Sequence, residues 1–177
     1  MKPFNSVSIV KYPVEQVWTT IRDRLPELVP YMEDVEKITL LQREDRQDGI
    51  VSLDNLWQSN PRLPMLQSLH LDPDLFAWTD RAEWDSQNHT CRWRIEPRLL
   101  PDQVQCSGVA RYEAALGGRG TRVTFEGQLG VSAQSLPGMP YVDASLLKGV
   151  ELLASSLIPK NLRKMTEAVG SFLDQNP

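Results

Sequence analysis

An acidic residue stands in the middle of an apolar row in the segment LFAWTDRAEWD, residues 75–85. Alternate residues of a strand lie on one face, and here that row is Phe76, Trp78, Asp80, Ala82 and Trp84. Burial among aromatic rings would raise the pKa of Asp80, because desolvation disfavours the carboxylate. Such a group can orient a ligand hydroxyl or act as a general base. The alternatives are a bulge that turns Asp80 outward, or an arginine or backbone amide that satisfies it.

Two more polar residues, Asn55 and Tyr112, occur on otherwise apolar rows of other expected strands. Asn55 has the same two interpretations as Asp80, a ligand anchor or a side chain satisfied by the protein. Asp80 and Tyr112 are the catalytic candidates, but no nucleophile–base set can be assembled around either residue. Three polar groups on an apolar face indicate a ligand with a few polar atoms.

Tryptophans form a second group of candidates. Their rings either line a site for a flat or polyene ligand or belong to the core. Trp57 and Trp78 flank the loop 60–74, so we expect them at the mouth of a site, and Met139 in SLPGMP borders the same opening. The predicted ligand-binding residues are Asn55, Trp57, Trp78, Asp80, Trp93, Tyr112, Phe125, Met139, Leu153 and Leu157.

Metal and cofactor sites are not indicated by any motif. The sequence has no G-x-G-x-x-G after an expected strand, no P-loop, no H-E-x-x-H and no G-x-S-x-G. His70 and His89 are single residues in a loop or at the edge of a turn. Cys91 and Cys106 have no second metal ligand nearby in the sequence, and we interpret them as small buried thiols. We therefore expect no metal and no cofactor.

Composition is that of a globular protein of ordinary size. The 177 residues fit a single domain over 1–177, with 41% hydrophobic and 24% charged residues. The net charge of −4 argues against a nucleic-acid partner, which requires a basic surface. No apolar run approaches the roughly 20 residues that cross a bilayer, and no secretory leader is recognised. Two cysteines do not make a disulfide framework, so we expect a cytoplasmic protein. The oligomeric state is not indicated.

Periodicity predicts the elements that position these residues. Residues 5–11 alternate as a strand, Pro13 then precedes an amphipathic helix, and PELVPYM forms at most a short second helix. Six strands follow at roughly 34–44, 49–59, 75–85, 89–97, 103–115 and 120–132. Apolar residues at helical spacing predict a closing helix over 143–173, in which Pro159 causes a kink or a break near Ser155.

The six strands are expected to form an up-and-down meander. Short polar turns join alternate pairs, so the three longer connections must all lie at one end of the sheet, where binding sites are often built. The turn GGRG places Arg111 opposite Glu126, and the connection RLLPD places Trp93 opposite Cys106. The apolar face is expected to include Leu40. A slip of one residue would exchange the two faces of a strand.

This order of elements resembles the START-like, or SRPBCC, superfamily with its helix-grip fold. The resemblance is carried by VSIVKYPVEQVWTTIRD, by the hairpin GVARYEAALGGRGTRVTFEGQLGV and by the helix VELLASSLIPKNLRKM. The small bacterial members described as polyketide cyclase or dehydrase-like are the most similar. The resemblance implies an α+β fold: strand, two helices, six-strand antiparallel meander and long C-terminal helix, with a seven-stranded curved sheet. It also implies an elongated, largely apolar cavity between sheet and helix, with loop 60–74 in the position of a gate.

Three functions are compatible with these residues. The first, which we favour because polar groups are sparse, is binding or transport of a small hydrophobic ligand, such as a lipid, isoprenoid or polyketide-like molecule. The second is a polyketide cyclase or dehydratase in which Asp80 or Tyr112 acts as the cavity acid or base. The third is an interaction or chaperone-like domain whose own side chains fill the cavity. An internal void too small for a ligand would favour this third function.

Overall fold

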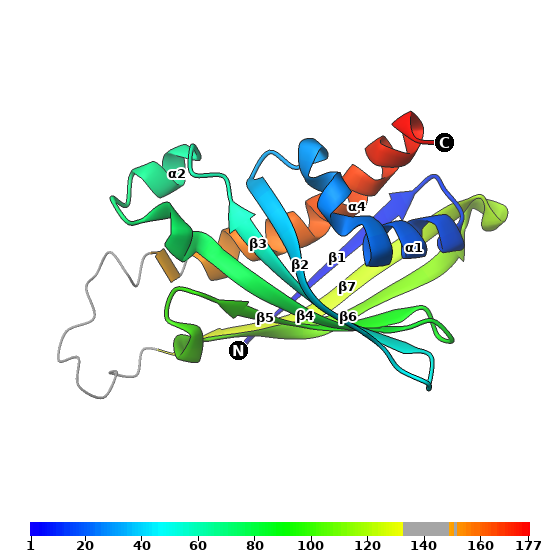
Figure 1. Ribbon diagram of the computed structural model, residues 1–177, viewed down its shortest axis with the longest axis horizontal. Coiled ribbons are helices and arrows are strands. Elements are labelled where there is room, and N and C mark those ends of the chain that lie inside the picture. Colours follow the sequence, from blue (N-terminus) through cyan, green and yellow to red (C-terminus); the bar gives the residue numbers. More distant parts are fainter. Residues whose placement is uncertain (133–148, 151) are drawn as a thin grey trace.

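A seven-stranded antiparallel sheet forms the frame of the molecule (Figure 1). The computed structural model describes residues 1–132, 149–150 and 152–177, without the side chain of residue 153. The strands are β1 (Lys2–Val10), β2 (Val35–Asp45), β3 (Ile50–Ser59), β4 (Ala77–Asp85), β5 (Thr90–Pro97), β6 (Val104–Ala115) and β7 (Gly120–Val131). Their order across the sheet is β1-β7-β6-β5-β4-β3-β2. The predicted meander of six strands is therefore confirmed, and β1 extends it by pairing with β7.

Two helical segments connect β1 to β2. The helix α1 (Val14–Arg24) begins directly after Pro13, and the 3-10 helix η1 (Leu25–Tyr31) contains two prolines. Proline lacks the N–H that a continuing α-helix needs, which explains the tighter, short second helix that was predicted. The remaining short helices are α2 (Pro64–Gln67), η2 (Pro73–Phe76), η3 (Pro101–Gln103) and η4 (Leu116–Gly118).

The C-terminal helix carries an irregular turn at the predicted place. A π-helical turn, η5 (Leu153–Leu157), leads into the α-helix α4 (Ile158–Gln175). Pro159 cannot donate a backbone hydrogen bond to the preceding turn, and such a gap favours a local change of helical pitch. The side-chain amide of Asn161 donates to the carbonyl of Leu157 at 2.8 Å. The other predicted residues of this helix, 143–148 and 151, lie outside the described residues.

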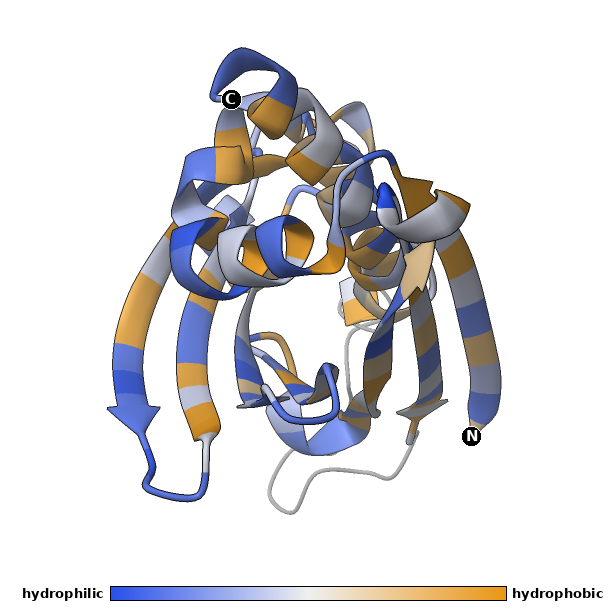
Figure 2. Ribbon diagram, turned by 90° about the vertical axis from the view of Figure 1, so that its right-hand side faces the viewer, coloured by the Kyte–Doolittle hydropathy of each residue, from blue (hydrophilic) through white to orange (hydrophobic). Residues whose placement is uncertain are grey.

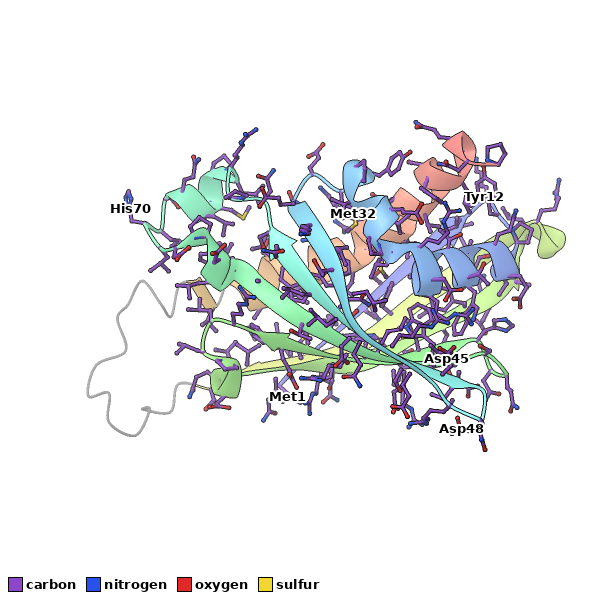
Figure 3. The ribbon with its side chains drawn as sticks, in the orientation of Figure 1. Met1, Tyr12, Met32, Asp45, Asp48 and His70 are labelled. Atoms are coloured by element: carbon purple, nitrogen blue, oxygen red, sulfur yellow. The ribbon has the colours of Figure 1, made fainter. Side chains whose placement is uncertain are left out.

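The sheet curves around α1 and α4, which lie on its concave face (Figure 2). The apolar stripe predicted for α4 is buried there, with Leu162, Met165, Val169 and Phe172 each 7% exposed or less. Each such side chain contributes about 1.5–3 kcal/mol when it is removed from water. The far end of α4 is held by Tyr12, whose hydroxyl donates to Asp174 at 2.5 Å (Figure 3).

A buried ion pair ties α4 to the segment between η1 and β2. The side chain of Asp34 is only 4% exposed, and Lys160 Nζ lies 2.7 Å from its Oδ2. Lys164 follows one helical turn later, with its Nζ 3.7 Å from the same oxygen. Because a buried carboxylate is costly without a counter-charge, the two lysines fix this side of α4 against the sheet.

Two of the long connections lie at one end of the sheet, as expected. The segment with α2, which includes His70, lies at the end opposite to the β2–β3 hairpin, which includes Asp48 (Figure 3). The connection that contains η3 is at the same end as α2 (Figure 1). The third connection, 133–148, lies outside the described residues. In the part of the chain that the structure describes, no helix is both long and apolar enough to cross a membrane.

Two predicted registers are wrong by two residues. Trp93 lies opposite Gly108 instead of Cys106, and Arg111 lies opposite Thr124 instead of Glu126. The turns cause the difference, because η4 accommodates three residues with positive φ before β7 begins. An even shift leaves every side chain on its predicted face, and the guanidinium of Arg111 still pairs diagonally with Glu126.

Leu40 is not where the alternation placed it. Leu40 was expected on the buried face but is 47% exposed. The pairing of β2 with β3 is irregular between Leu40 and Gln42. A bulge of this kind inserts an extra residue and bends an edge strand away from regular alternation.

Candidate functional site

A small cavity of about 20 Å³ lies between the sheet and the helices, with Asp80 in its wall. The residues around it come from α1, η1, five strands and α4: Ile21, Leu25, Asn55, Asp80, Trp84, Cys91, Trp93, Ala110, Tyr112, Phe125, Leu162 and Met165. A cavity of this volume holds about one water molecule. The elongated cavity implied by the resemblance is therefore not found around Asp80, because large aromatic rings occupy the space.

Five of the ten predicted ligand-binding residues meet at this cavity. They are Asn55, Asp80, Trp93, Tyr112 and Phe125, one from each strand from β3 to β7. Antiparallel pairing brings them together, because directly opposed residues share a face. The structure thus assembles half of the predicted set into one wall.

Asp80 faces inward. The pairing of β4 with both of its neighbours runs without a bulge, so the predicted alternative of an outward turn is not found. Oδ1 of Asp80 is buried and has no hydrogen-bond partner among the described residues. The side chain keeps some accessible surface because it borders the cavity. No arginine or backbone amide of the described residues satisfies it.

The electrostatics of Asp80 follow from this position. Burial, together with a smaller contribution from the nearby charge of Asp54, raises the pKa of Asp80 to about 7. Asp54 lies on the outer face, where its carboxylate pairs with Arg81 at 2.7 Å. A carboxyl group with a pKa near 7 can gain or lose a proton close to neutral pH.

Asn55 and Tyr112 add an amide and a phenol to the same wall. They are 4% and 3% exposed, and neither side chain makes a hydrogen bond to another described residue. Burial raises the pKa of Tyr112 well above 10, and the nearby Cys91 and Asp80 raise it further. Tyr112 therefore keeps its proton at neutral pH and can donate a hydrogen bond rather than act as a base.

The two cysteines are free and buried, as predicted. Burial raises the pKa of Cys91 well above 9 and that of Cys106 to about 12. Thiols of this kind are poor nucleophiles, because the thiolate is the reactive form. Among the described residues, no group of three or more His, Cys, Asp or Glu side chains is placed to hold a metal ion.

The other predicted residues lie apart from the cavity or outside the description. Trp57 and Trp78 stack on one another at 5.6 Å with 19° between their planes, and both are 2% exposed. They belong to the hydrophobic core and do not line the cavity at Asp80. Leu157 is fully buried in η5. Met139 and the side chain of Leu153 lie outside the described residues.

The helical side of the cavity was missed as a ligand-binding surface. Ile21 of α1, Leu25 of η1, and Leu162 and Met165 of α4 close the space over the sheet. Their signal was the apolar spacing at i, i+3 and i+4, which shows a buried face but does not tell core from ligand contact. Only the assembled fold brings these residues to Asp80.

A pair of glycines positions the Trp93 ring. A Cβ atom on Gly108 would lie 2.6 Å from Cζ2 of Trp93, and one on Gly127 would lie 2.7 Å from Cη2 of the same ring. Because Gly108 and Gly127 are directly opposed on β6 and β7, the indole can approach the backbone of both strands closely. The position of Trp93 in the cavity wall therefore depends on the absence of side chains at Gly108 and Gly127.

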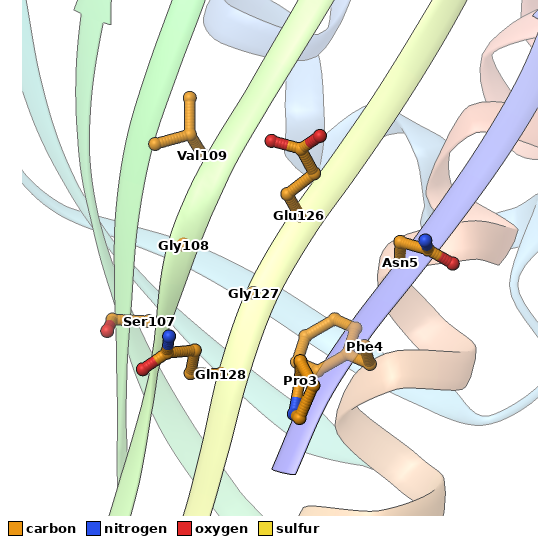
Figure 4. Close-up of a pocket in the computed structure, with 9 residues that line it drawn as sticks. All are labelled: Pro3, Phe4, Asn5, Ser107, Gly108, Val109, Glu126, Gly127 and Gln128. Carbon is orange, nitrogen blue, oxygen red and sulfur yellow. The ribbon is translucent and has the colours of Figure 1, made fainter. Parts of the chain in front are cut away.

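A separate open groove runs along the outer side of β1, β6 and β7 around the same two glycines (Figure 4). Its one charged residue, Glu126, already pairs with Arg111. None of the buried polar atoms that lack a partner in the described residues belongs to this groove. The Asp80 cavity therefore has the stronger chemical signature of a binding site.

Solved structures share this architecture at low sequence identity. An aromatase/cyclase, Zhui, from a Streptomyces species has a TM-score of 0.65 at 15% identity, covering 98% of this chain and 94% of its own. Norcoclaurine synthase from Thalictrum flavum has a TM-score of 0.60 at 13% identity, covering 97% and 92%. The protein TTHA0849 from Thermus thermophilus has a TM-score of 0.59 at 19% identity, covering 95% and 97%.

The sequence itself matches no protein-family model and no curated protein. Identities this low show a shared fold and not a shared reaction. The neighbours, the seven-stranded curved sheet and the long C-terminal helix agree with the resemblance seen in the sequence. This chain has the helix-grip fold that the resemblance implied.

Proposed function

We propose that the protein binds a small, largely apolar molecule whose polar end reaches Asp80 in the interior between the sheet and α4. One observation carries the proposal. A carboxyl group, an amide and a phenol share one cavity wall without a hydrogen bond among the described residues. Polar groups buried in this way are costly, and a core with only a packing role has no use for them.

The small cavity meets the condition that favours the alternative of an interaction or chaperone-like domain, because it is too small for a whole ligand. A volume of about 20 Å³ admits the polar end of a ligand but not its body, so binding requires neighbouring side chains to move. Met165 and Leu162 are the movable part of the wall. Met165 is unbranched and adaptable, and both residues follow the π-helical turn that interrupts the C-terminal helix. A completely filled interior would account for the volume but not for the unpartnered carboxyl group.

Native mass spectrometry tests this proposal directly. Protein purified without detergent should carry a bound apolar compound, and the Asp80→Asn variant should carry less of it. Glu83→Gln is the matched control, because Glu83 lies on the outer side of the same strand and pairs with Arg46. A titration with 1-butanol, followed by NMR at the indole N–H groups of Trp84 and Trp93, gives a second readout. Purified protein that carries no bound compound, together with indole signals that do not change on titration, would contradict the proposal.

A cyclase or dehydratase reaction is the second candidate, and the pKa of Asp80 near 7 is the observation that favours it. In this role Asp80 moves a proton on a substrate with β-keto groups, while Tyr112 donates a hydrogen bond to the oxygen that becomes negative. Asp80→Asn should then lower turnover by ~10²–10⁴, as is typical for lost acid–base catalysis. Unchanged turnover in this variant would leave binding as the function.

We propose that the protein is located in the cytoplasm and that its partner is a small hydrophobic molecule. The unpaired state of Cys91 and Cys106 supports a reducing compartment. We also keep the predicted domain boundaries, 1–177, because the strands at the two ends of the sheet belong to one continuous hydrogen-bonded array.

A further inference from the structure

Asp80 is the one charged side chain among the described residues that line the cavity. The nearest arginine in the sequence, Arg81, lies on the opposite face, with its nitrogens 2.7 Å from Asp54 and 2.9 Å from Glu96. The lysines that α4 places near the sheet pair with Asp34. A negative charge on Asp80 therefore has no counter-charge in the part of the interior that the structure describes.

Other titratable groups face Asp80 from the neighbouring strands. Cys91 comes from β5, and Cys106 and Tyr112 come from β6. All three stay protonated near neutral pH, because burial raises the pKa of each, that of Cys106 to about 12. Outside the cavity, the charge of Asp54 is balanced by Arg81. Asp80 alone among these groups changes its charge close to neutral pH.

Aromatic rings surround the carboxyl group. Trp84, Trp93, Tyr112 and Phe125 all line the cavity. The faces of such rings attract cations, and burial away from water strengthens the attraction. The cavity of about 20 Å³ can hold a group about as large as one water molecule, such as a primary ammonium group. It is too small for a quaternary ammonium group.

We infer that the ligand of this site carries a primary ammonium group, which forms an ion pair with Asp80 inside the aromatic wall. The inference rests on the function proposed above and names the chemical class of the ligand. A primary ammonium group has three N–H donors. The wall offers acceptor oxygens on Asp80, Asn55 and Tyr112, and none of them is engaged by another described residue. The negative charge of Asp80 and these acceptor oxygens therefore both match a primary ammonium group.

The sign of the pH dependence separates this inference from its alternatives. An ammonium ligand needs the ionised carboxylate, so its affinity must rise with pH through the pKa of Asp80, about 7. A ligand carbonyl needs the protonated acid as a donor, so its affinity must fall over the same range. Between pH 6 and pH 8 the ionised fraction of Asp80 increases about tenfold, and the affinity for an ammonium group should increase by the same factor.

The experiment compares n-butylamine with 1-butanol, which have the same slender chain and differ in the polar end. NMR titrations at pH 6 and pH 8 follow the indole N–H signals of Trp84 and Trp93. Butylamine stays protonated at both pH values, and we expect it to bind about tenfold more tightly at pH 8 than at pH 6. We expect the affinity for 1-butanol to change much less, because its hydroxyl can accept from the protonated acid and donate to the carboxylate. Asp80→Asn should remove the pH dependence and the preference for the amine.

The result that overturns the inference is binding of 1-butanol at pH 8 that is as tight as or tighter than that of butylamine, or an amine affinity that stays constant or falls as the pH rises. In that case the site still binds a small molecule and the proposed function stands. If neither probe changes the indole signals, the proposed function and the inference both fail. The pH comparison uses the unaltered chain, so it remains decisive even if the Asp80→Asn variant does not fold.

Discussion

Asn55 and Asp80 lie directly opposite one another on β3 and β4, and both side chains line the same cavity. Opposed residues of antiparallel strands have Cβ atoms about 4.5–5.5 Å apart. No hydrogen bond joins the two side chains, so each is available to a third group placed between them. An amide and a carboxyl group presented in parallel from adjacent strands make two contact points for one polar ligand atom.

The contribution of Asp80 to the stability of the protein should fall as the pH rises from 4 to 8. Its pKa is raised from 3.8 to about 7 in the folded state, so between these values the folded chain binds a proton that the unfolded chain has lost. At about 1.4 kcal/mol per pKa unit, the free energy of unfolding loses about 4 kcal/mol over this range. Urea unfolding at several pH values measures the change.

Asp80→Asn isolates the contribution of this residue. The amide cannot ionise, so the variant should be more stable than the wild type at pH 8. Its free energy of unfolding should also depend much less on pH between pH 4 and pH 7. Glu83→Gln, on the outer side of the same strand, should leave the slope unchanged. An equal slope in Asp80→Asn and the wild type would show that Asp80 titrates normally in the folded protein.

Met165→Ala should enlarge the cavity next to Asp80. The substitution removes a buried thioether chain from its wall and should destabilise the protein by about 2–5 kcal/mol. It should also tighten the binding of 1-butanol, because less of the wall has to move. Met32→Ala is the matched control, since Met32 is 2% exposed but does not line the cavity. Equal effects of both variants on alcohol binding would argue against a site at this position.

Gly108→Ala should be destabilising although it adds only one methyl group. The new Cβ would lie 2.1 Å from the carbonyl oxygen of Glu126 and 2.6 Å from the ring of Trp93, so the strand or the indole must shift. Overpacking of this kind costs about 1–3 kcal/mol. Gly170→Ala in α4 is the control, because its nearest neighbour is 3.9 Å away and alanine favours the helix by about 0.5–1 kcal/mol. Thermal unfolding of both variants should give shifts of opposite sign.

Replacing the lysines of the ion pair at Asp34 should destabilise the protein more than replacing Asp34 itself. Replacing Lys160 and Lys164 together by Met leaves the 4% exposed carboxylate without a counter-charge. The free energy of unfolding should then fall by about 3–5 kcal/mol. Asp34→Asn leaves two lysines that are 34% and 23% exposed and can turn to water, so its effect should be smaller. Denaturant unfolding of the variants measures both losses. A larger loss in Asp34→Asn would contradict this account of the pair.

The inward position of Asp80 could be predicted from the sequence because the side chains of a strand alternate with a period of two. The same rule correctly placed Asn55 and Tyr112, even though the pairing registers of β5 with β6 and of β6 with β7 were wrong. A shift of two residues does not change the face. The helix break before Pro159 was predictable for a similar reason, since one missing N–H has a local effect.

Other features depend on geometry that no local pattern records. The positive φ angles at η4 set the register of the last hairpin, and the bulge after Leu40 has no distinctive residue to mark it. The volume of the cavity depends on how the rings of Trp84, Trp93 and Phe125 pack against α4. Periodicity shows which residues face inward, but it does not show how much space remains between them.

The pairing of β1 with β7 has a consequence for the order of events during synthesis. The strand β1 finds its hydrogen-bonding neighbour only after more than a hundred further residues have emerged from the ribosome, because residues 120–131 form that neighbour. Until then β1 has no place in the sheet. Pairing across such a sequence separation is slow, so the nascent chain holds β1 unpaired until the hairpin of β6 and β7 completes the sheet.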